Sequence, residues 1–199
     1  MVKLVNQTLF SAKIKGKNIP IFTSNQVMAI FGLSKAATDA LLHRYTKSGF
    51  ITRLKRGLYA FPDALPPDVF IANKLYEPSY VSLESALSYH SVIPETVYAV
   101  TSVTTKATRR FEFDGKIFIF RRVKKQAFTG YEPTRQNGIN FLIANAEKAL
   151  VDAQYFRLFE GQKPLSRFRK DRINKIKALR YAELFENNKL VSIIITSLQ

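Results

Sequence analysis

The sequence predicts an α+β protein with two domains, one over residues 1–65 and one over residues 66–199. Capped amphipathic segments, which are typical of helices, alternate with short apolar segments that are typical of strands. Two pairs of expected strands surround a turn that contains Gly. Between the domains, three prolines at positions 62, 66 and 67 interrupt any regular element, because proline has no backbone N–H to donate.

The composition indicates a folded chain and excludes several kinds of protein. The 199 residues are 46% hydrophobic and include 16 Phe, which is enough to build a core. No stretch reaches the roughly 18 apolar residues of a membrane span. The chain has no Cys, which excludes disulfides, Cys-based zinc sites and a thiol nucleophile. The start, MVKLVNQTLF, has no secretory pattern. We therefore expect a cytoplasmic protein with no membrane partner.

The net charge of +16 is concentrated at the two ends of the chain. Residues 1–65 hold ten basic and two acidic residues, a net of +8, and residues 161–199 hold nine and three, a net of +6. Residues 66–160 hold twelve and ten, a net of +2. Two basic regions around a nearly neutral middle favour a polyanionic partner, although a merely basic surface gives the same totals.

The N-terminal domain is expected to begin with a helix over Leu4–Ile14, with Leu4, Leu9 and Phe10 facing inward. Residues 19–22 follow as a short extended segment. A second helix is expected over Ser24–Phe31, and its apolar residues Val27, Ile30 and Phe31 face the core.

The second helix carries clear start and stop signals. Thr23 is an N-cap, and Gln26 three residues later completes a capping box. Gly32 ends the helix. A third helix is expected from its cap at Ser34 to Lys47, with Ala37, Leu41, Leu42 and Tyr45 inward, before Ser48 and Gly49. Two short strands, residues 50–54 and 58–61, then surround Lys55-Arg56-Gly57.

This order of elements predicts a winged helix-turn-helix domain, in which the third helix enters a major groove of DNA and the hairpin reaches neighbouring phosphates or the minor groove. Winged helices also serve in protein contacts, and that alternative stays open. Polar and basic side chains are expected on the outer face of the third helix and on the hairpin. The predicted DNA-binding residues are Ser34, Lys35, Thr38, His43, Arg44, Lys47, Arg53, Lys55 and Arg56. We expect Lys35 and Thr38, near the helix start, to contact bases or phosphates.

The second domain is expected to be a mixed α/β domain with a small antiparallel sheet. Asp114-Gly115 is the two-residue turn of a hairpin in RRFEFDGKIFIFRR. The apolar ending KLVSIIITSLQ indicates a buried strand or a helix end. Helices are expected over residues 67–76, from Ser82 and over 144–159, strands over 97–103 and 138–143, and a basic helical tail after them.

Pairing across the Asp114-Gly115 turn places Phe111, Phe113, Phe118 and Phe120 on one face of the hairpin. A row of phenylalanines stacks on nucleic-acid bases in some proteins. More commonly such a face packs into the core, and we predict a core face here.

Three stretches of the chain resemble one protein family. YVSLESALSYHSVIPE, residues 80–95, is similar to the signature Y-x-S-x-x-S-A-L-x-x-H-G-L-x-P of the AbiEi-type antitoxins of type IV toxin–antitoxin (abortive infection) systems. IANAEKALVD, residues 143–152, resembles that family's A-x-x-E-K-A-L-x-D segment, and the first domain ends in RGLYAFP in the family's style. The resemblance spans residues 20–155. It departs at Ser91, where the family often has Gly, and it does not extend to the basic tail.

The resemblance implies a phage-defence protein with two roles and no cofactor. Such antitoxins bind inverted repeats in their own promoter through the winged helix and repress the operon. Their C-terminal domain counteracts a nucleotidyltransferase-like toxin, without a stable complex between the two proteins. The motif residues that the resemblance selects are Tyr80, Ser82, Ser85, His90, Glu147, Lys148 and Asp152.

The chemistry of these motif residues also permits a structural role. Ser82 fits a helix N-cap, and Tyr80 and His90 can form hydrogen bonds at helix ends. Glu147 and Lys148 can pair with neighbouring elements. A structural role is therefore the first expectation for the set, with an antitoxin-specific surface as the alternative.

The sequence contains no Gly-rich phosphate loop and no G-x-S-x-G elbow, so we expect no enzyme and no metal site. A nuclease site is an alternative that would use Glu95, Glu112, Asp114 and Lys116. However, the hairpin turn already explains the presence of Asp114. Two other functions stay open beside the antitoxin: a winged-helix transcriptional regulator without a toxin partner, and an RNA-binding protein.

Overall fold

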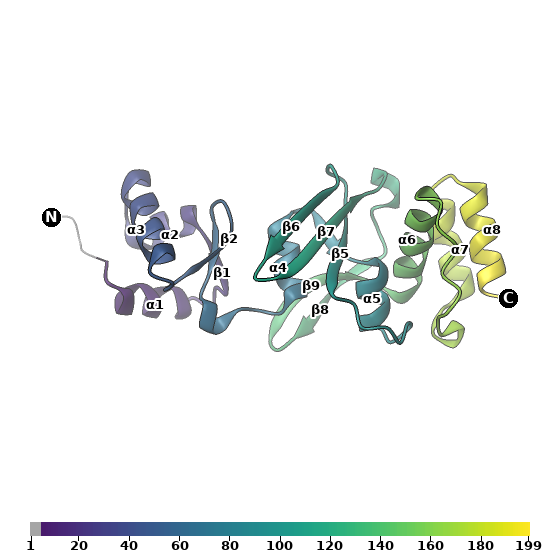
Figure 1. Cartoon of the computed structure of the whole chain (residues 1–199), viewed down its shortest axis with the longest axis horizontal. Coiled ribbons are helices and arrows are strands. Elements are labelled where there is room, and N and C mark those ends of the chain that lie inside the picture. The colour runs from purple at the N-terminus through teal and green to yellow at the C-terminus, as the bar shows by residue number, and fades with distance from the viewer. Residues whose placement is uncertain (1–4) are drawn as a thin grey trace. The chain divides into compact units, whose positions relative to one another are not determined.

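The computed structural model describes residues 5–199, and it divides the chain into two compact units, Met1–Pro67 and Asp68–Gln199 (Figure 1). Each unit has its own sheet and helices. Leu4, for which the sequence predicts an inward position, lies outside the described residues.

The first unit is a three-helix domain with a three-stranded antiparallel sheet in the order β1-β3-β2. This is the predicted winged helix-turn-helix order of elements. The elements are α1 (Gln7–Lys15), β1 (Ile21–Thr23), α2 (Ser24–Phe31), α3 (Lys35–Lys47), β2 (Thr52–Lys55), β3 (Leu58–Ala60) and a 3-10 turn at Pro62–Ala64.

The helix caps predicted for α2 and α3 are confirmed. The Thr23 hydroxyl accepts the Gln26 backbone N–H at 3.2 Å, and Gln26 Oε1 accepts the Thr23 N–H at 2.8 Å. Gly32 ends α2 in the left-handed conformation, with φ 63°. The Ser34 hydroxyl accepts the Ala37 N–H at 3.3 Å and so caps α3.

The core of the first unit is built around Phe10, which is fully buried. Its ring contacts those of Phe22, Phe31, Tyr45, Phe50 and Phe61. The predicted inward position of Leu9 is wrong, because Leu9 is 40% exposed. Helix α1 begins only at Gln7 and buries a single stripe, Phe10 and Ile14, which are four residues apart.

The second unit contains one mixed sheet in the order β6-β7-β5-β4-β9-β8. The pairs β4–β9 and β5–β7 are parallel, and the other pairs are antiparallel. The strands are β4 (Ser79–Val81), β5 (Ala99–Thr104), β6 (Arg109–Phe113), β7 (Lys116–Arg122), β8 (Tyr131–Gln136) and β9 (Ile139–Ala144). The helices are α4 (Asp68–Leu75), α5 (Leu83–Tyr89), α6 (Ala146–Phe159), α7 (Lys175–Glu183) and α8 (Asn188–Ser197), with 3-10 turns at Lys125–Ala127 and Lys170–Arg172.

The α+β class is confirmed, but the second sheet is larger than the small antiparallel sheet that the sequence predicts. The sequence pattern predicts neither β4 nor β8. Strand β4 has only three residues, all buried, and β8 is polar and contains Pro133. Neither shows the apolar alternation that identifies a strand.

Helices cover both faces of this sheet. Paired residues of neighbouring strands share a face, so Phe120 lies on the same side as Ser102 and Val81. On that side the Phe120 ring contacts Tyr76, which follows α4. On the other side, Arg121 lies over the ring of Phe156 in α6, with 4.3 Å from its guanidinium carbon to the ring centroid.

The phenylalanine face of the β6–β7 hairpin belongs to the core, as predicted. Phe118 and Phe120 are fully buried, and Phe111 and Phe113 are partly buried beside them. The two inner rings therefore have no surface on which a base can stack.

The last forty residues are helical, and KLVSIIITSLQ ends the chain as α8 rather than as a strand. Helices α7 and α8 pack with α6 at the C-terminal end of the unit (Figure 1). No helix within residues 5–199 is both long and apolar enough to cross a membrane.

Ser91 occupies a backbone conformation that favours Gly. Its φ is 54°, in the left-handed region, and the next N–H, of Val92, turns back to the carbonyl of Leu87 at 2.8 Å. Ser91 thus stands at the C-terminal turn of α5, where the resembling family often has Gly. The Ser side chain costs conformational energy there, because its Cβ crowds the backbone.

We expect Ser91→Gly to raise the free energy of unfolding by about 0.5–1 kcal/mol, because it relieves this left-handed strain. Urea denaturation followed by circular dichroism measures the change. Ser192→Gly, at an exposed position inside α8, is the matched control and should lower stability by a similar amount. A loss of stability in both variants would show that Ser91 is not strained.

Candidate nucleic-acid interface

The first unit has an open groove of about 720 Å³ between α3 and the β2–β3 hairpin. Most of the side chains that line it are basic or polar, and they come from α2, α3 and the β2–β3 hairpin. The lining residues are Ser24, Lys35, Asp39, His43, Thr46, Lys47, Arg53, Arg56, Gly57 and Tyr59.

The spacing of residues on α3 explains why one side of this helix lines the groove. Lys35, Asp39, His43 and Lys47 are four residues apart, so they follow one another along one face of the helix. The opposite, inward stripe holds Leu41, Leu42 and Tyr45, whose burial holds α3 in place. The core of the unit thereby turns the charged stripe toward solvent.

The hairpin supplies the other wall of the groove. Gly57 closes its turn with φ 76°, and its carbonyl accepts the backbone N–H of Ser24 at 3.3 Å. This bond attaches the hairpin turn to the start of α2. Arg53 and Arg56 are exposed on the hairpin, and both line the groove opposite α3.

The groove is electrostatically suited to a polyanion. Four of its lining residues carry a positive charge, Lys35, Lys47, Arg53 and Arg56, and only Asp39 carries a negative one. Within residues 5–199, none of these four cations forms an ion pair with a carboxylate. Among the lining residues, four positive charges thus face one negative charge, which leaves the groove with a net positive charge.

Thr38 does not belong to this surface, and its predicted place on the exposed face of α3 is wrong. Thr38 is fully buried, and its hydroxyl donates to the Ser34 carbonyl at 3.0 Å. Its position three residues before Leu41 and seven before Tyr45 puts it on the inward stripe of the helix. Its short polar side chain is accommodated there by a bond to the preceding turn.

Three further predicted residues, Arg44, Lys55 and Ser34, lie outside the groove. Arg44 lines a different surface hollow between α3 and α1, and its guanidinium carbon lies 5.8 Å from the ring centroid of Tyr45. Lys55 is partly buried and does not line the groove. Ser34 is exposed at the start of α3 but also does not line it. The groove brings together Lys35, His43, Lys47, Arg53 and Arg56.

The groove also contains residues that sequence reasoning did not select as contacts, namely Ser24, Asp39, Thr46, Gly57 and Tyr59. The four-residue spacing from Lys35 identifies Asp39. Tyr59 alternates with the buried Leu58 and Ala60 along β3, which is the signal for a side chain on the opposite face of that strand.

The motif residues of the second unit form a buried polar network centred on Asp152 in α6. Tyr80, Ser82, Lys148 and Asp152 are all completely buried. Asp152 accepts hydrogen bonds from the hydroxyls of Ser82 at 2.7 Å and Tyr80 at 3.2 Å, and it forms an ion pair with Lys148 one turn earlier. Ser82 stands at the N-cap position of α5, but its hydroxyl goes to Asp152, so the predicted side-chain cap is wrong.

Burial shifts the pKa of each ionisable group in this network against its charged form. It raises the pKa of the Asp152 carboxyl, although Lys148 and the two hydroxyls oppose the rise. Burial likewise lowers the pKa of the Lys148 ammonium, against the attraction of Asp152. Burial and the nearby Asp152 raise the pKa of Tyr80 well above its ordinary value. All three groups are buried away from solvent. Their contacts join α6 to β4 and to the start of α5, so the network has a structural role.

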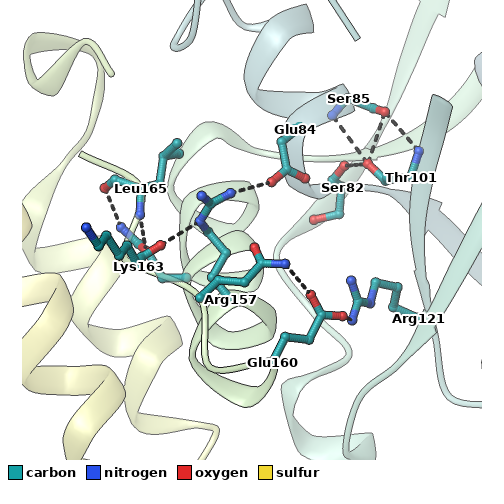
Figure 2. Close-up of polar contacts among 11 residues, drawn as sticks. Ser82, Glu84, Ser85, Thr101, Arg121, Arg157, Glu160, Lys163 and Leu165 are labelled. Atoms are coloured by element: carbon teal, nitrogen blue, oxygen red, sulfur yellow. Dashed lines mark hydrogen bonds and ion pairs between the residues drawn. The ribbon is translucent and has the colours of Figure 1, made fainter. Parts of the chain in front are cut away.

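Ser85 connects α5 to the sheet, as Figure 2 shows. Its hydroxyl donates to the Ala99 carbonyl at 2.9 Å and accepts the Thr101 N–H at 2.9 Å. The Thr101 hydroxyl in turn donates to the Ser82 carbonyl at 2.8 Å. The start of α5 is therefore bonded to β5 through both side chains and backbone.

Glu147 and His90 each contact another element of the second unit. Glu147 accepts the Asn174 N–H at 3.1 Å and pairs with Lys177 at 3.1 Å, so it links α6 to the start of α7. His90 Nε2 lies 2.8 Å from the Ala144 carbonyl. These contacts join neighbouring elements, as the structural reading of the motif predicts.

The residues of the alternative nuclease site have separate structural partners. Asp114 occupies the hairpin turn with φ 51°, and Lys116 pairs with Asp68 at 2.8 Å. Within residues 5–199, no three His, Asp or Glu side chains are placed to hold a metal ion together.

The groove lies within the part of the chain that matches a known family. Residues 16–62 match the family model described as "Transcriptional regulator, AbiEi antitoxin". Residues 16–62 are therefore identified as an AbiEi antitoxin regulator domain. The match contains α2, α3 and the β2–β3 hairpin, and it ends before the second unit. No curated protein is similar enough to the chain to count as a relative.

Over residues 16–62, which include RGLYAFP, the match confirms the AbiEi resemblance that the sequence indicated. This family consists of antitoxins and regulators and is not an enzyme family. The two motifs of the second unit, residues 80–95 and 143–152, lie outside the matched segment.

Replacing Lys148 by Met should lower the free energy of unfolding by about 3–5 kcal/mol, because it leaves the buried Asp152 charge without its partner. Adding Asp152→Asn should restore at least half of this loss, since the amide oxygen still accepts from Ser82 and Tyr80. Urea denaturation of the wild type, both single variants and the double variant measures the coupling. Additive losses would contradict a shared network.

The cost of Lys148→Met should also depend on pH. The pKa of Asp152 is raised in the folded chain, so the folded chain binds more protons than the unfolded chain just above the ordinary Asp pKa. Stability contributed by this group therefore falls as the pH rises through that window. Removing Lys148 removes the main influence that lowers the pKa of Asp152, so in the variant this pKa rises further and the fall is larger. We expect the loss in the Lys148→Met variant to be smaller at about pH 5 than at about pH 8.

Proposed function

We propose that the chain is a DNA-binding autorepressor and the antitoxin of a type IV toxin–antitoxin system, and that it counteracts a nucleotidyltransferase-like toxin. The observation that carries the DNA-binding part is the groove between α3 and the hairpin. Its four cations have no carboxylate partner within residues 5–199, and they lie in the segment that matches the AbiEi regulators.

The geometry supports a division of labour in DNA binding. The N-terminal turn of α3 presents Lys35 and the capped helix start, a place where backbone N–H groups and a cation attract phosphate or reach a base edge. Arg53 and Arg56 on the hairpin are placed for neighbouring phosphates. We infer that α3 provides sequence reading and that the hairpin provides affinity for any duplex.

The antitoxin part of the proposal rests on the family match and on the motifs of the second unit. Because the motif residues there are buried or bonded between elements, they act by shaping this unit. Any surface that opposes a toxin must then be formed by other, exposed side chains of residues 68–199.

The first test is fluorescence anisotropy of the full chain on duplex DNA from its own upstream region, with a scrambled duplex of equal length as control. We expect the upstream duplex to bind at least tenfold more tightly, about 1.4 kcal/mol. Equal binding to both duplexes that disappears with added salt would show that the groove is a basic surface without sequence specificity. Preference for duplex RNA would favour the RNA-binding alternative.

The antitoxin part needs a separate test in cells. The chain is co-expressed with a nucleotidyltransferase-like toxin encoded next to it, and growth and promoter activity are measured together. We expect the wild type to restore growth and to repress a promoter reporter. The double variant Lys35→Ala/Arg56→Ala should lose repression and still restore growth. Repression without restored growth would leave a winged-helix regulator without a toxin partner.

Arg56→Ala should weaken binding to all duplexes and reduce the salt slope by about one unit, because it removes one phosphate contact. Arg44→Ala is the matched control, since Arg44 carries the same charge in the same unit but lies outside the groove. Anisotropy at several salt concentrations gives both slopes. Equal salt slopes for Arg56→Ala and the wild type would show that Arg56 does not contact a phosphate.

A further inference from the structure

Strand β6 is one of the two edges of the six-stranded sheet, with β7 as its neighbour on one side only. Asp114 and Gly115 join β6 to β7 with φ values of 51° and 70°, as in a two-residue type I′ turn. In such a hairpin the residues that flank the turn, Phe113 and Lys116, exchange both backbone hydrogen bonds.

The bonding pattern fixes which backbone groups of β6 point out of the sheet. Hydrogen-bonded and non-bonded pairs alternate along an antiparallel ladder, so Phe111 and Arg109 also bond to β7. Arg110 and Glu112 then direct their N–H and C=O groups away from β7. The outer edge of β6 thus offers two donors and two acceptors to another strand.

Arg110 and Glu112 also share one face of the sheet and have opposite charges. Their side chains are 61% and 65% exposed, and they form an ion pair with each other at 3.6 Å. This pair is open to solvent, so it contributes little stability and is easily exchanged for another partner.

We propose that the edge of β6 pairs with β6 of a second copy of this chain, antiparallel and centred on Phe111. In this register Arg110 lies opposite Glu112 of the second copy, and the twofold symmetry repeats the contact. In both Arg110–Glu112 pairs, the outward N–H and C=O groups of one strand lie opposite those of the other. The register therefore lets the exposed backbone donors and acceptors of both strands form hydrogen bonds.

The neighbouring registers are excluded by charge. A shift by two residues in either direction places Arg110 opposite Arg110, or Glu112 opposite Glu112, and like charges in directly opposed pairs destabilise a ladder. On the other face, the centred register brings the two partly buried Phe111 rings together and sets Arg109 against Phe113. Charge, backbone and aromatic contacts therefore select the same register.

The other edge of the sheet, β8, does not offer the same pairing. Its hairpin turn is Asn137-Gly138, so Gln136 and Ile139 close the ladder and Pro133 falls among the outward-facing positions. Proline has no N–H, which interrupts that edge. Among the described strands of this sheet, β6 is the edge suited to a second copy.

The contact consists of one five-residue strand from each copy, so it is small, and we expect a dimer with a micromolar or weaker dissociation constant. Sedimentation equilibrium of the full chain over a wide concentration range, without DNA, measures it. The samples are the wild type, Arg110→Glu, Glu112→Arg, the equimolar mixture of these two variants, and the double variant.

The mixture makes the test specific. In each single variant both opposed pairs become like-charged, so self-association should weaken at least tenfold. In the mixture, and in the double variant, both pairs are again opposite in charge, and association should return. Added salt should weaken the mixture's association, because exposed charges are screened.

A wild-type chain that stays monomeric at every concentration overturns the proposal. So does a mixture that associates no more tightly than the single variants do. Circular dichroism of each variant verifies folding, which the high exposure of both side chains should preserve. Because no DNA is present, failure here is distinct from failure of the proposed function.

Discussion

The buried carboxylate of Asp152 is the constraint on which the arrangement of the second unit depends. Burying a charge is costly unless it is paired and hydrogen-bonded, and Asp152 obtains these partners from three places: its own helix, β4 and the start of α5. Rotating or sliding α6 would take the buried carboxylate away from the hydroxyls of Tyr80 and Ser82, which lie outside the helix. This fixed rotation also directs Arg157 toward Glu84 and brings Glu160 to Arg121 (Figure 2).

The same constraint extends to the basic C-terminal segment. Gln154, half a turn beyond Asp152, accepts the Leu165 N–H at 2.9 Å and donates to its carbonyl at 2.8 Å. On the other side of α6, a Cβ at Gly130 would lie 2.9 Å from the side chain of Lys148 and 2.8 Å from Tyr181 of α7. The buried pair thus packs directly against the backbone that leads into β8, and only Gly fits there.

The sequence allowed local features to be predicted better than positions that depend on distant contacts. The Thr23 capping box, the Ser34 cap and the Asp114-Gly115 turn were readable because each rests on neighbouring residues. The inward place of Thr38 was readable from its spacing to Leu41 and Tyr45, but its polarity pointed outward. The burial of Lys148 was not readable, because a lysine in a helix is normally exposed and its partners lie in distant strands.

The groove cations differ from three cations of the second unit, and this bears on where a polyanion can bind. In the second unit Arg121, Arg157 and Lys177 are each matched by a carboxylate of the same unit, so recruiting them would first break an internal ion pair. The groove cations Lys35, Lys47, Arg53 and Arg56 have no such partner among the described residues. A phosphate that enters the groove displaces only water and counterions, and release of counterions is itself favourable. Binding a polyanion in the groove therefore requires no internal ion pair of the described residues to be broken.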